Sequence, residues 1–319
     1  MWQRAGGVVM DYNEILTQCP ASGSGVHSWM MTVANIGARD GVDAGQVADD
    51  IRKHMTRNPT SGSEVAETVR KAYAEKGESY TPDVKTPEEK AFQRELVAKM
   101  QSRAFLRLAG DPIEMHELAN ISPVDVKCIQ GYESHTAAKL LLYLYDRHEL
   151  VWCGEMYGGQ EGLKTVEQWA ESFLCCDEVP PLFIPNPMTG KGGKTKSGKE
   201  TYRCDETVAE WRYALFEVDH EEITLGHQAA FWKRQIEKDD GIPVEAITYS
   251  GGKSLHALIR VDCKTEIEWD KKVRNGAFPA WMRLGADKSC RNPSRLSRLP
   301  GHMRDGERLQ SLLYLRGGK

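Results

Sequence analysis

The sequence has no long run of apolar residues. No segment approaches the roughly 18 to 20 consecutive apolar residues that a membrane-crossing helix needs, and the first residues, 1–7, lack the apolar core of a secretion signal. We therefore expect a cytoplasmic protein that does not bind a membrane.

The eight cysteines include no C-x-x-C pair. Compact zinc sites usually contain at least one such pair, so we expect reduced, mostly buried thiols and no zinc cofactor. A dispersed zinc site is the alternative, and it would use Cys153, Cys175, Cys176 and Cys204.

A general excess of basic residues is also missing. The net charge is -4 over 319 residues, whereas nucleic-acid-binding proteins usually carry a basic surface. Two segments, 188–203 and 283–308, are nevertheless locally basic. Each could contact phosphates, and a solvated charged surface is the ordinary alternative, particularly for the first. The candidate nucleic-acid contacts of the first segment are Lys191, Lys194, Lys196 and Arg203.

The hydrophobic content of 40% can fill the cores of two globular domains. Residues 26–37, 42–55 and 61–77 place apolar side chains at helical spacing, which predicts a small all-α domain over residues 1–80. Residues 81–121 should contain a linker and then a long helix from Thr86 to Gly110.

From residue 122 onward helices and strands alternate. A Pro-rich and then Gly/Lys-rich loop, 179–199, interrupts them. Long antiparallel strands with helices on one face predict an α+β domain over residues 122–319. The expected helices are 135–145, 164–174, 224–238 and 267–273, and the expected strands are 150–153, 212–219, 246–250, 255–261, 295–299 and 309–315.

The strand expected at 212–219 ends in two carboxylates, Glu217 and Asp219. Alternate residues of a strand face the same way, so these two project together while Phe216 and Val218 enter the core. Carboxylate oxygens suit Mg²⁺ or Mn²⁺, so this pair is a candidate metal site. A solvated acid-x-acid pair on an exposed strand is the ordinary alternative.

A glycine turn precedes the strand expected at 255–261, where residues 250–256 read SGGKSLH. The glycines permit a tight turn and close approach of a phosphate, and Lys253, Ser254 and His256 can donate hydrogen bonds to it. This is not a Walker loop, because the glycine spacing differs and the turn leads into a strand.

A third segment, 284–301, combines one acid with several arginines. Its apolar residues Leu296 and Leu299 predict partial burial, so the arginines need carboxylate or phosphate partners. An internal ion pair with the acid is the alternative for at least one of them. Asp262 is a rival for the acid of this segment. The acid and the arginines are Asp287, Arg291, Arg295 and Arg298.

In this order and spacing the three motifs resemble the archaeo-eukaryotic primase superfamily, and more closely its phage- and plasmid-type primase-polymerases. SGGKSLH and the later PSRLSRLPG are long enough to be specific. The likeness extends upstream through FIPNPMTG and TYRCD, so it covers roughly residue 122 to the end, and the helical first domain resembles more weakly the small modules that accompany such primases. It implies a catalytic domain with an RRM-like antiparallel sheet. The family commonly has Asp where this chain has Glu217, a difference of one methylene.

The resemblance implies template-directed nucleotidyl transfer on single-stranded DNA. Two ions, Mg²⁺ or Mn²⁺, would be held by Glu217, Asp219 and Asp287. No helicase or ATPase motif is present, so a separate replicative helicase is an expected partner. The residues expected to bind an incoming NTP or dNTP are Lys253, Ser254, His256, Arg291, Arg295 and Arg298.

Two other functions stay open. Clustered carboxylates and a histidine also suit phosphodiester cleavage by a metal-dependent nuclease, although a nicking enzyme of the relaxase kind would need a His-x-His pair that the sequence lacks. A non-catalytic DNA-binding module of a replication complex is the second alternative.

Overall fold

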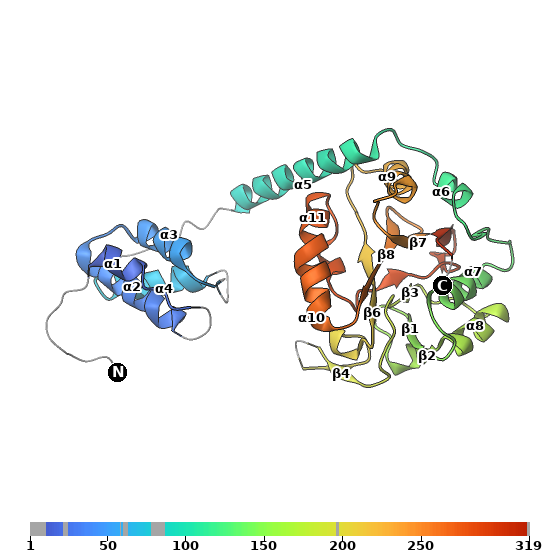
Figure 1. Cartoon of the computed structure of the whole chain (residues 1–319), viewed down its shortest axis with the longest axis horizontal. Helices are drawn as coiled ribbons and strands as arrows, with labels where there is room; N and C mark the ends of the chain where they lie inside the picture. Colours follow the sequence, from blue (N-terminus) through green and yellow to red (C-terminus); the bar gives the residue numbers. More distant parts are fainter. Residues whose placement is uncertain are drawn as a thin grey trace. The chain divides into compact units, whose positions relative to one another are not determined.

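The computed structural model describes residues 11–21, 25–57, 59, 63–77, 87–195 and 198–317, with the backbone alone at 87–90. The chain divides into two compact units, Met1–Phe92 and Gln93–Lys319 (Figure 1). Each unit has its own hydrophobic core.

The first unit is all-helical, as the sequence predicts. Asp43 caps one helix by accepting a hydrogen bond from the Gln46 N–H at 3.0 Å. Met30, Val33 and Ile51 are fully buried where the helices meet, so the apolar stripes read from the sequence form one core. The helices are α1 (Tyr12–Leu16), α2 (Val26–Asp40), α3 (Ala44–His54) and α4 (Glu64–Ala74).

The second unit begins earlier than the sequence predicts. Residues 81–121 were expected to form a separate linker and helix, but α5 (Pro87–Ala109) and α6 (His116–Asn120) carry Phe105, Ala109 and Leu118 into the core of this unit. The ring of Phe105 lies 4.7 Å from that of Phe231. The unit therefore starts at Gln93 rather than at Ser122. Residues 78–86, which hold most of the predicted linker, lie outside the described part of the chain.

The main sheet of the second unit has four strands in the order β12-β7-β8-β6, all antiparallel to their neighbours. The helix α9 (Leu225–Glu237) connects β6 to β7, and β8 lies between these two strands, which is the split βαβ arrangement. Phe216, Phe231 and Trp232 pack together beneath it. The strands are β6 (Trp211–Phe216), β7 (Val244–Tyr249), β8 (Leu255–Cys263) and β12 (Ser311–Leu315).

A second, smaller antiparallel sheet has the order β2-β1-β3-β9, and α7 (Ser134–Leu144) and α8 (Val166–Leu174) lie together beside it (Figure 1). The unit is therefore α+β. The strands of this sheet are β1 (Leu150–Gly154), β2 (Leu163–Thr165), β3 (Leu182–Phe183) and β9 (Ser297–Arg298). Two short hairpins are β4 (Gly193–Lys194) with β5 (Glu200–Thr201), and β10 (Met303–Arg304) with β11 (Arg308–Leu309). The remaining helices are η1 (Gln160–Gly162), η2 (Asp205–Thr207), α10 (Glu266–Trp269), the π-helix η3 (Asp270–Ala277), α11 (Phe278–Arg283) and η4 (Lys288–Arg291).

Within the described residues, every helix is too short or too polar to span a lipid bilayer.

Candidate functional site

Glu217 and Asp287 are brought together by the backbone. Regular pairing of β6 ends at Phe216, but Val218 continues the strand direction through a bridge to Ala286. The Asp287 N–H donates to the Glu217 carbonyl at 2.9 Å. Val218 and Ala286 are both buried, so alternation turns the side chains of Glu217 and Asp287 to the opposite face.

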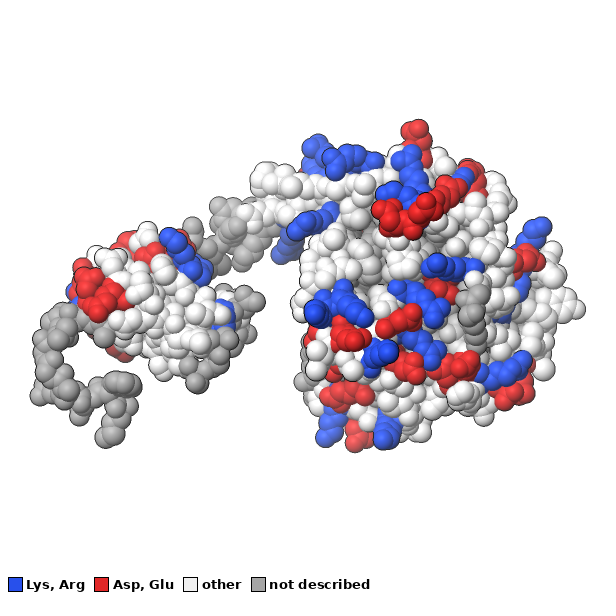
Figure 2. Space-filling model, in the orientation of Figure 1, with Lys and Arg blue, Asp and Glu red and all other residues white. Residues whose placement is uncertain are grey.

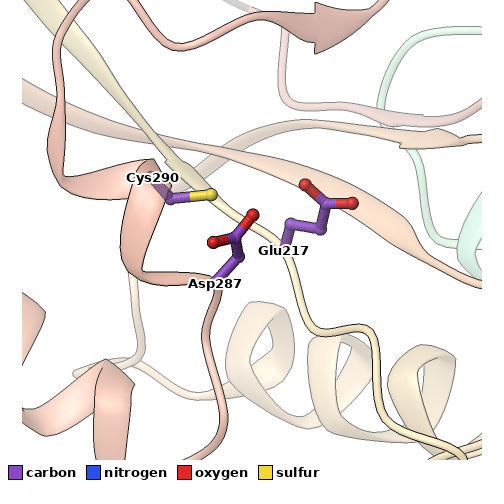
Figure 3. Close-up of side chains that lie close together, drawn as sticks. All are labelled: Glu217, Asp287 and Cys290. Carbon is purple, nitrogen blue, oxygen red and sulfur yellow. The ribbon is translucent and has the colours of Figure 1, made fainter.

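Three potential metal ligands meet on that face. The ligand atoms of Glu217, Asp287 and Cys290 lie within 4.8 Å of one another. Figure 3 shows the Asp287 carboxylate between the Glu217 carboxylate and the Cys290 thiol. The sequence predicts the first two as partners, and the thiol is an addition from η4.

Asp219 does not join this group. Its side chain is exposed, and it makes no hydrogen bond or ion pair with the described residues. Strand pairing does not extend from the Val218–Ala286 bridge to Asp219, because Gly285 lies in a turn with φ +87°. Two members of the predicted carboxylate trio therefore lie close together, and Asp219 lies outside their group.

A guanidinium group already bridges the two close carboxylates. Arg295 Nη2 lies 2.8 Å from Asp287 Oδ2 and 3.7 Å from Glu217 Oε2. The internal ion pair weighed in the sequence analysis is therefore present for Arg295. It also shows that a cation fits between these oxygens.

Ser254, just before β8, and His256 at its start approach Glu217. The Ser254 hydroxyl donates to Glu217 Oε1 at 3.1 Å, and His256 Nε2 lies 3.2 Å from the same oxygen. The Arg298 N–H donates to His256 Nδ1 at 3.3 Å. An accepting Nδ1 leaves the proton of the neutral imidazole on Nε2, which faces Glu217. The second predicted motif thus contacts the first through one oxygen atom.

These neighbours keep Glu217 ionised. Burial alone would raise the pKa of its carboxyl group, but His256, Arg295 and the Ser254 hydroxyl lower that pKa from 4.5 to about 2. The site therefore offers a negative charge at neutral pH, as a divalent cation requires.

A pair of arginines lies beside the glycine turn. Arg298 is half-buried and makes no ion pair with the described residues. Burial and the charge of Arg304 lower the pKa of Arg298. Arg304 in turn lies against the turn, since a side chain at Gly252 would approach Arg304 Nη1 to 2.8 Å. Arg304 pairs with the exposed Asp305 at 3.6 Å, whereas Arg298 has no such partner among the described residues. Arg298, with a second cation nearby, is therefore suited to a polyanion.

The glycine turn is held from behind by buried polar groups. The Ser250 N–H donates to the Ser254 carbonyl at 3.1 Å, and Gln228 Nε2 donates to the Lys253 carbonyl at 3.0 Å. The Lys253 side chain is exposed to solvent. The turn is thus a fixed support that leaves its lysine free to contact a ligand.

Other predicted binding residues lie apart from this cluster. Arg291 is exposed, and its carbonyl accepts a hydrogen bond from Trp269. Lys191 and Lys194 are exposed near the β4–β5 hairpin, whereas Lys196 lies outside the described residues. The guanidinium of Arg203 lies 5.0 Å from the ring of Trp152, as in a cation–π contact.

The rival carboxylate lies elsewhere. Asp262 pairs with Arg260 at 2.8 Å near the far end of β8. In the described part of the chain, Cys153, Cys175, Cys176 and Cys204 form no cluster of potential metal ligands.

Two residues of the site were not predicted from the sequence as site residues: Cys290 and Arg304. The signal for Arg304 was its place in the basic segment 283–308. Cys290 had no signal beyond its closeness to Asp287 in the sequence.

Comparisons of the chain with protein-family models, curated proteins and solved structures found no match.

Proposed function

We propose that this protein is a primase-polymerase that adds nucleotides to a strand on a single-stranded DNA template, in the manner of the archaeo-eukaryotic primases that its motifs resemble. The observation that carries the proposal is the convergence of Glu217, Asp287 and His256 from three separate segments, with Arg298 beside His256 and Arg304 at a glycine turn. This arrangement joins a cation site to an anion site.

The carboxylates fit Mg²⁺ or Mn²⁺. Glu217 and Asp287 offer carboxylate oxygens close enough to share a cation, as Arg295 shows. Asp219, which is exposed and lies two residues after Glu217 in the chain, would supply oxygen for a second ion. When bound, such ions activate the attacking hydroxyl group and offset charge on the leaving group. Arg295 would have to leave its bridging position, which frees it for phosphate.

The arginine pair and the glycine turn would hold the triphosphate of the incoming nucleotide. Arg298 and Arg304 supply charge, and the absence of a side chain at Gly252 lets the Arg304 guanidinium lie against the turn. Lys253 is exposed at the tip of the same turn. His256, fixed by the Arg298 N–H, would place its Nε2 proton toward an anionic oxygen.

The template would contact a few basic and aromatic side chains rather than one broad basic surface. Figure 2 shows basic and acidic side chains interspersed over the second unit on the face it presents. Arg203 stacked on Trp152, with Lys191 and Lys194 nearby in the sequence, is the candidate contact with DNA. A separate helicase would open the duplex for this protein.

The proposal is tested by incubating the protein with single-stranded DNA, Mn²⁺ and labelled nucleotides of each sugar type. We expect extension products from the wild type, and an Asp287→Asn variant should lose about 100-fold or more of this activity, the effect of losing one group that stabilises charge in the transition state. Asp262→Asn is the matched control, because Asp262 pairs with Arg260 outside the site.

Two results would overturn the proposal. Cleaved template without extension would identify a nuclease. A mobility shift without either product would identify a non-catalytic DNA-binding module.

A further inference from the structure

The thiol of Cys290 forms the inner wall of the carboxylate site. Asp287 Oδ1 accepts the Ser289 N–H at 2.9 Å, and the Asp287 carbonyl accepts the Cys290 N–H at 2.9 Å. This turn folds the cysteine back over the aspartate. Cys290 is fully buried, whereas Asp287 and Glu217 are partly exposed, so a cation that entered past the carboxylates would meet sulfur last.

Hard and soft cations use such a ligand set differently. Mg²⁺ takes oxygen ligands and leaves a thiol aside. Zn²⁺ and Co²⁺ accept sulfur, nitrogen and oxygen together, with ligands about 2.0 to 2.3 Å from the metal. The three ligand atoms here lie within 4.8 Å of one another, so side-chain movements of about an ångström would close them on such an ion.

A buried histidine orients one of the carboxylates. His256 is 4% exposed, its Nδ1 atom accepts the Arg298 N–H at 3.3 Å, and its Nε2 atom lies 3.2 Å from Glu217 Oε1. Because Nε2 carries the ring proton, His256 positions the Glu217 carboxylate and does not itself bind the cation. Carboxylates that bind metals are commonly held by such neighbours.

We propose that Glu217, Asp287 and Cys290 form a site for a thiophilic divalent cation such as Zn²⁺, which competes with Mg²⁺ or Mn²⁺ and switches the site off. Binding forms a metal–sulfur bond and releases the thiol proton to solvent. The two classes of ion exclude each other because they share both carboxylates. The inhibition rests on the proposed polymerase function, whereas the binding does not.

The binding is tested with Co²⁺ as a spectroscopic probe, on the full chain and without nucleotide or DNA. We expect a thiolate-to-cobalt charge-transfer band in the near ultraviolet and the visible bands of tetrahedral cobalt, both abolished by added Zn²⁺. The bands should disappear in Cys290→Ser and persist in Cys263→Ser, which removes a buried thiol of β8 that lies outside the group. Absence of the band from the wild type, or its persistence in Cys290→Ser, overturns the proposal.

A second variant guards against misfolding of Cys290→Ser. Asp287→Asn keeps the thiol but removes a ligand charge, and we expect it to weaken Co²⁺ binding by about tenfold or more. Unchanged affinity would show that the thiol binds Co²⁺ without this carboxylate, against the proposal.

Inhibition is then measured in the extension assay, with each variant compared with its own Mn²⁺-dependent rate. The Zn²⁺ concentration that halves the rate should rise about tenfold or more in Cys290→Ser. If no extension activity exists, the cobalt spectra still decide whether the site binds a thiophilic ion.

Discussion

Glu217 is the residue on which the other site groups converge. Its Oε1 atom faces Ser254 and His256, while its Oε2 atom faces Arg295. The family resemblance implied this meeting, and in the structure it arises because β8, which begins just after Ser254 and carries His256, pairs with β6.

The low pKa of Glu217 predicts how acid affects stability. Its pKa is about 2 in the folded protein against an ordinary value of 4.5, so the folded state favours the ionised form. The resulting stabilisation is complete above pH 4.5 and is lost as the pH falls toward 2. From the difference between these pKa values, it amounts to at most about 3 kcal/mol.

A Glu217→Gln variant should therefore lose stability relative to the wild type near neutral pH, and the difference should shrink as the pH falls from 4.5 to 2. Urea denaturation at several pH values, followed by tryptophan fluorescence, measures it. Glu200→Gln on the exposed β5 strand is the control. A constant difference between wild type and Glu217→Gln over this range would contradict the assignment.

At the scale of elements, the positions of helices and strands could be predicted from the sequence, but the contacts between segments far apart in the chain could not. The helices α2, α3 and α9 and the strands β7 and β8 lie close to the positions that apolar spacing predicts. Regular strand pairing stops at Phe216 rather than at Asp219, because only Val218 finds a partner beyond it. Alternation alone contains no information about where a partner strand ends.

Arg304 illustrates the same limit. It reaches the glycine turn because the β10–β11 hairpin folds back over residues more than fifty positions earlier in the chain. Such a contact depends on the path of the intervening segment, which includes the π-helix η3. No local pattern in the sequence predicted that path, whereas the abundance of arginine after Asp287 did indicate a basic cluster.

The glycine turn itself gives a stability prediction. Gly251 has φ +69°, and an added Cβ would lie 3.1 Å from the Arg308 carbonyl oxygen. Gly306 has a similar φ of +72°, but an added Cβ would meet nothing within 4 Å. Both alanine variants incur the cost of a left-handed backbone, and only Gly251→Ala adds a contact with a main-chain atom.

We therefore expect Gly251→Ala to be less stable than Gly306→Ala by about 1 kcal/mol or more, the lower range for overpacking. Thermal unfolding of the two variants side by side measures the difference. Equal stability would show that the β10–β11 hairpin does not press on the turn.

For the whole molecule, the two hydrophobic cores establish two units, but the sequence placed the boundary too late. The proline at the first turn of α5 and the glycine at its end predicted this helix correctly, because signals at helix ends are local. Its assignment to a connecting segment was wrong, because Phe105 packs on Phe231, more than a hundred residues away. The unit that holds the candidate site therefore needs the second half of α5.

Two fragments of the chain distinguish these boundaries. A fragment of residues 93–319 should fold and unfold cooperatively, because it retains Phe105, Ala109 and Leu118. A fragment of residues 122–319 lacks all three.

Loss of one buried phenylalanine alone costs about 3 to 5 kcal/mol, which approaches the roughly 5 to 15 kcal/mol that holds a typical domain together. The shorter fragment should therefore be cleaved rapidly in limited proteolysis and show no sharp thermal transition, whereas the longer one should resist the protease as the full chain does. Equal resistance of the two fragments would mean that α5 is dispensable for this fold and would restore the boundary at Ser122.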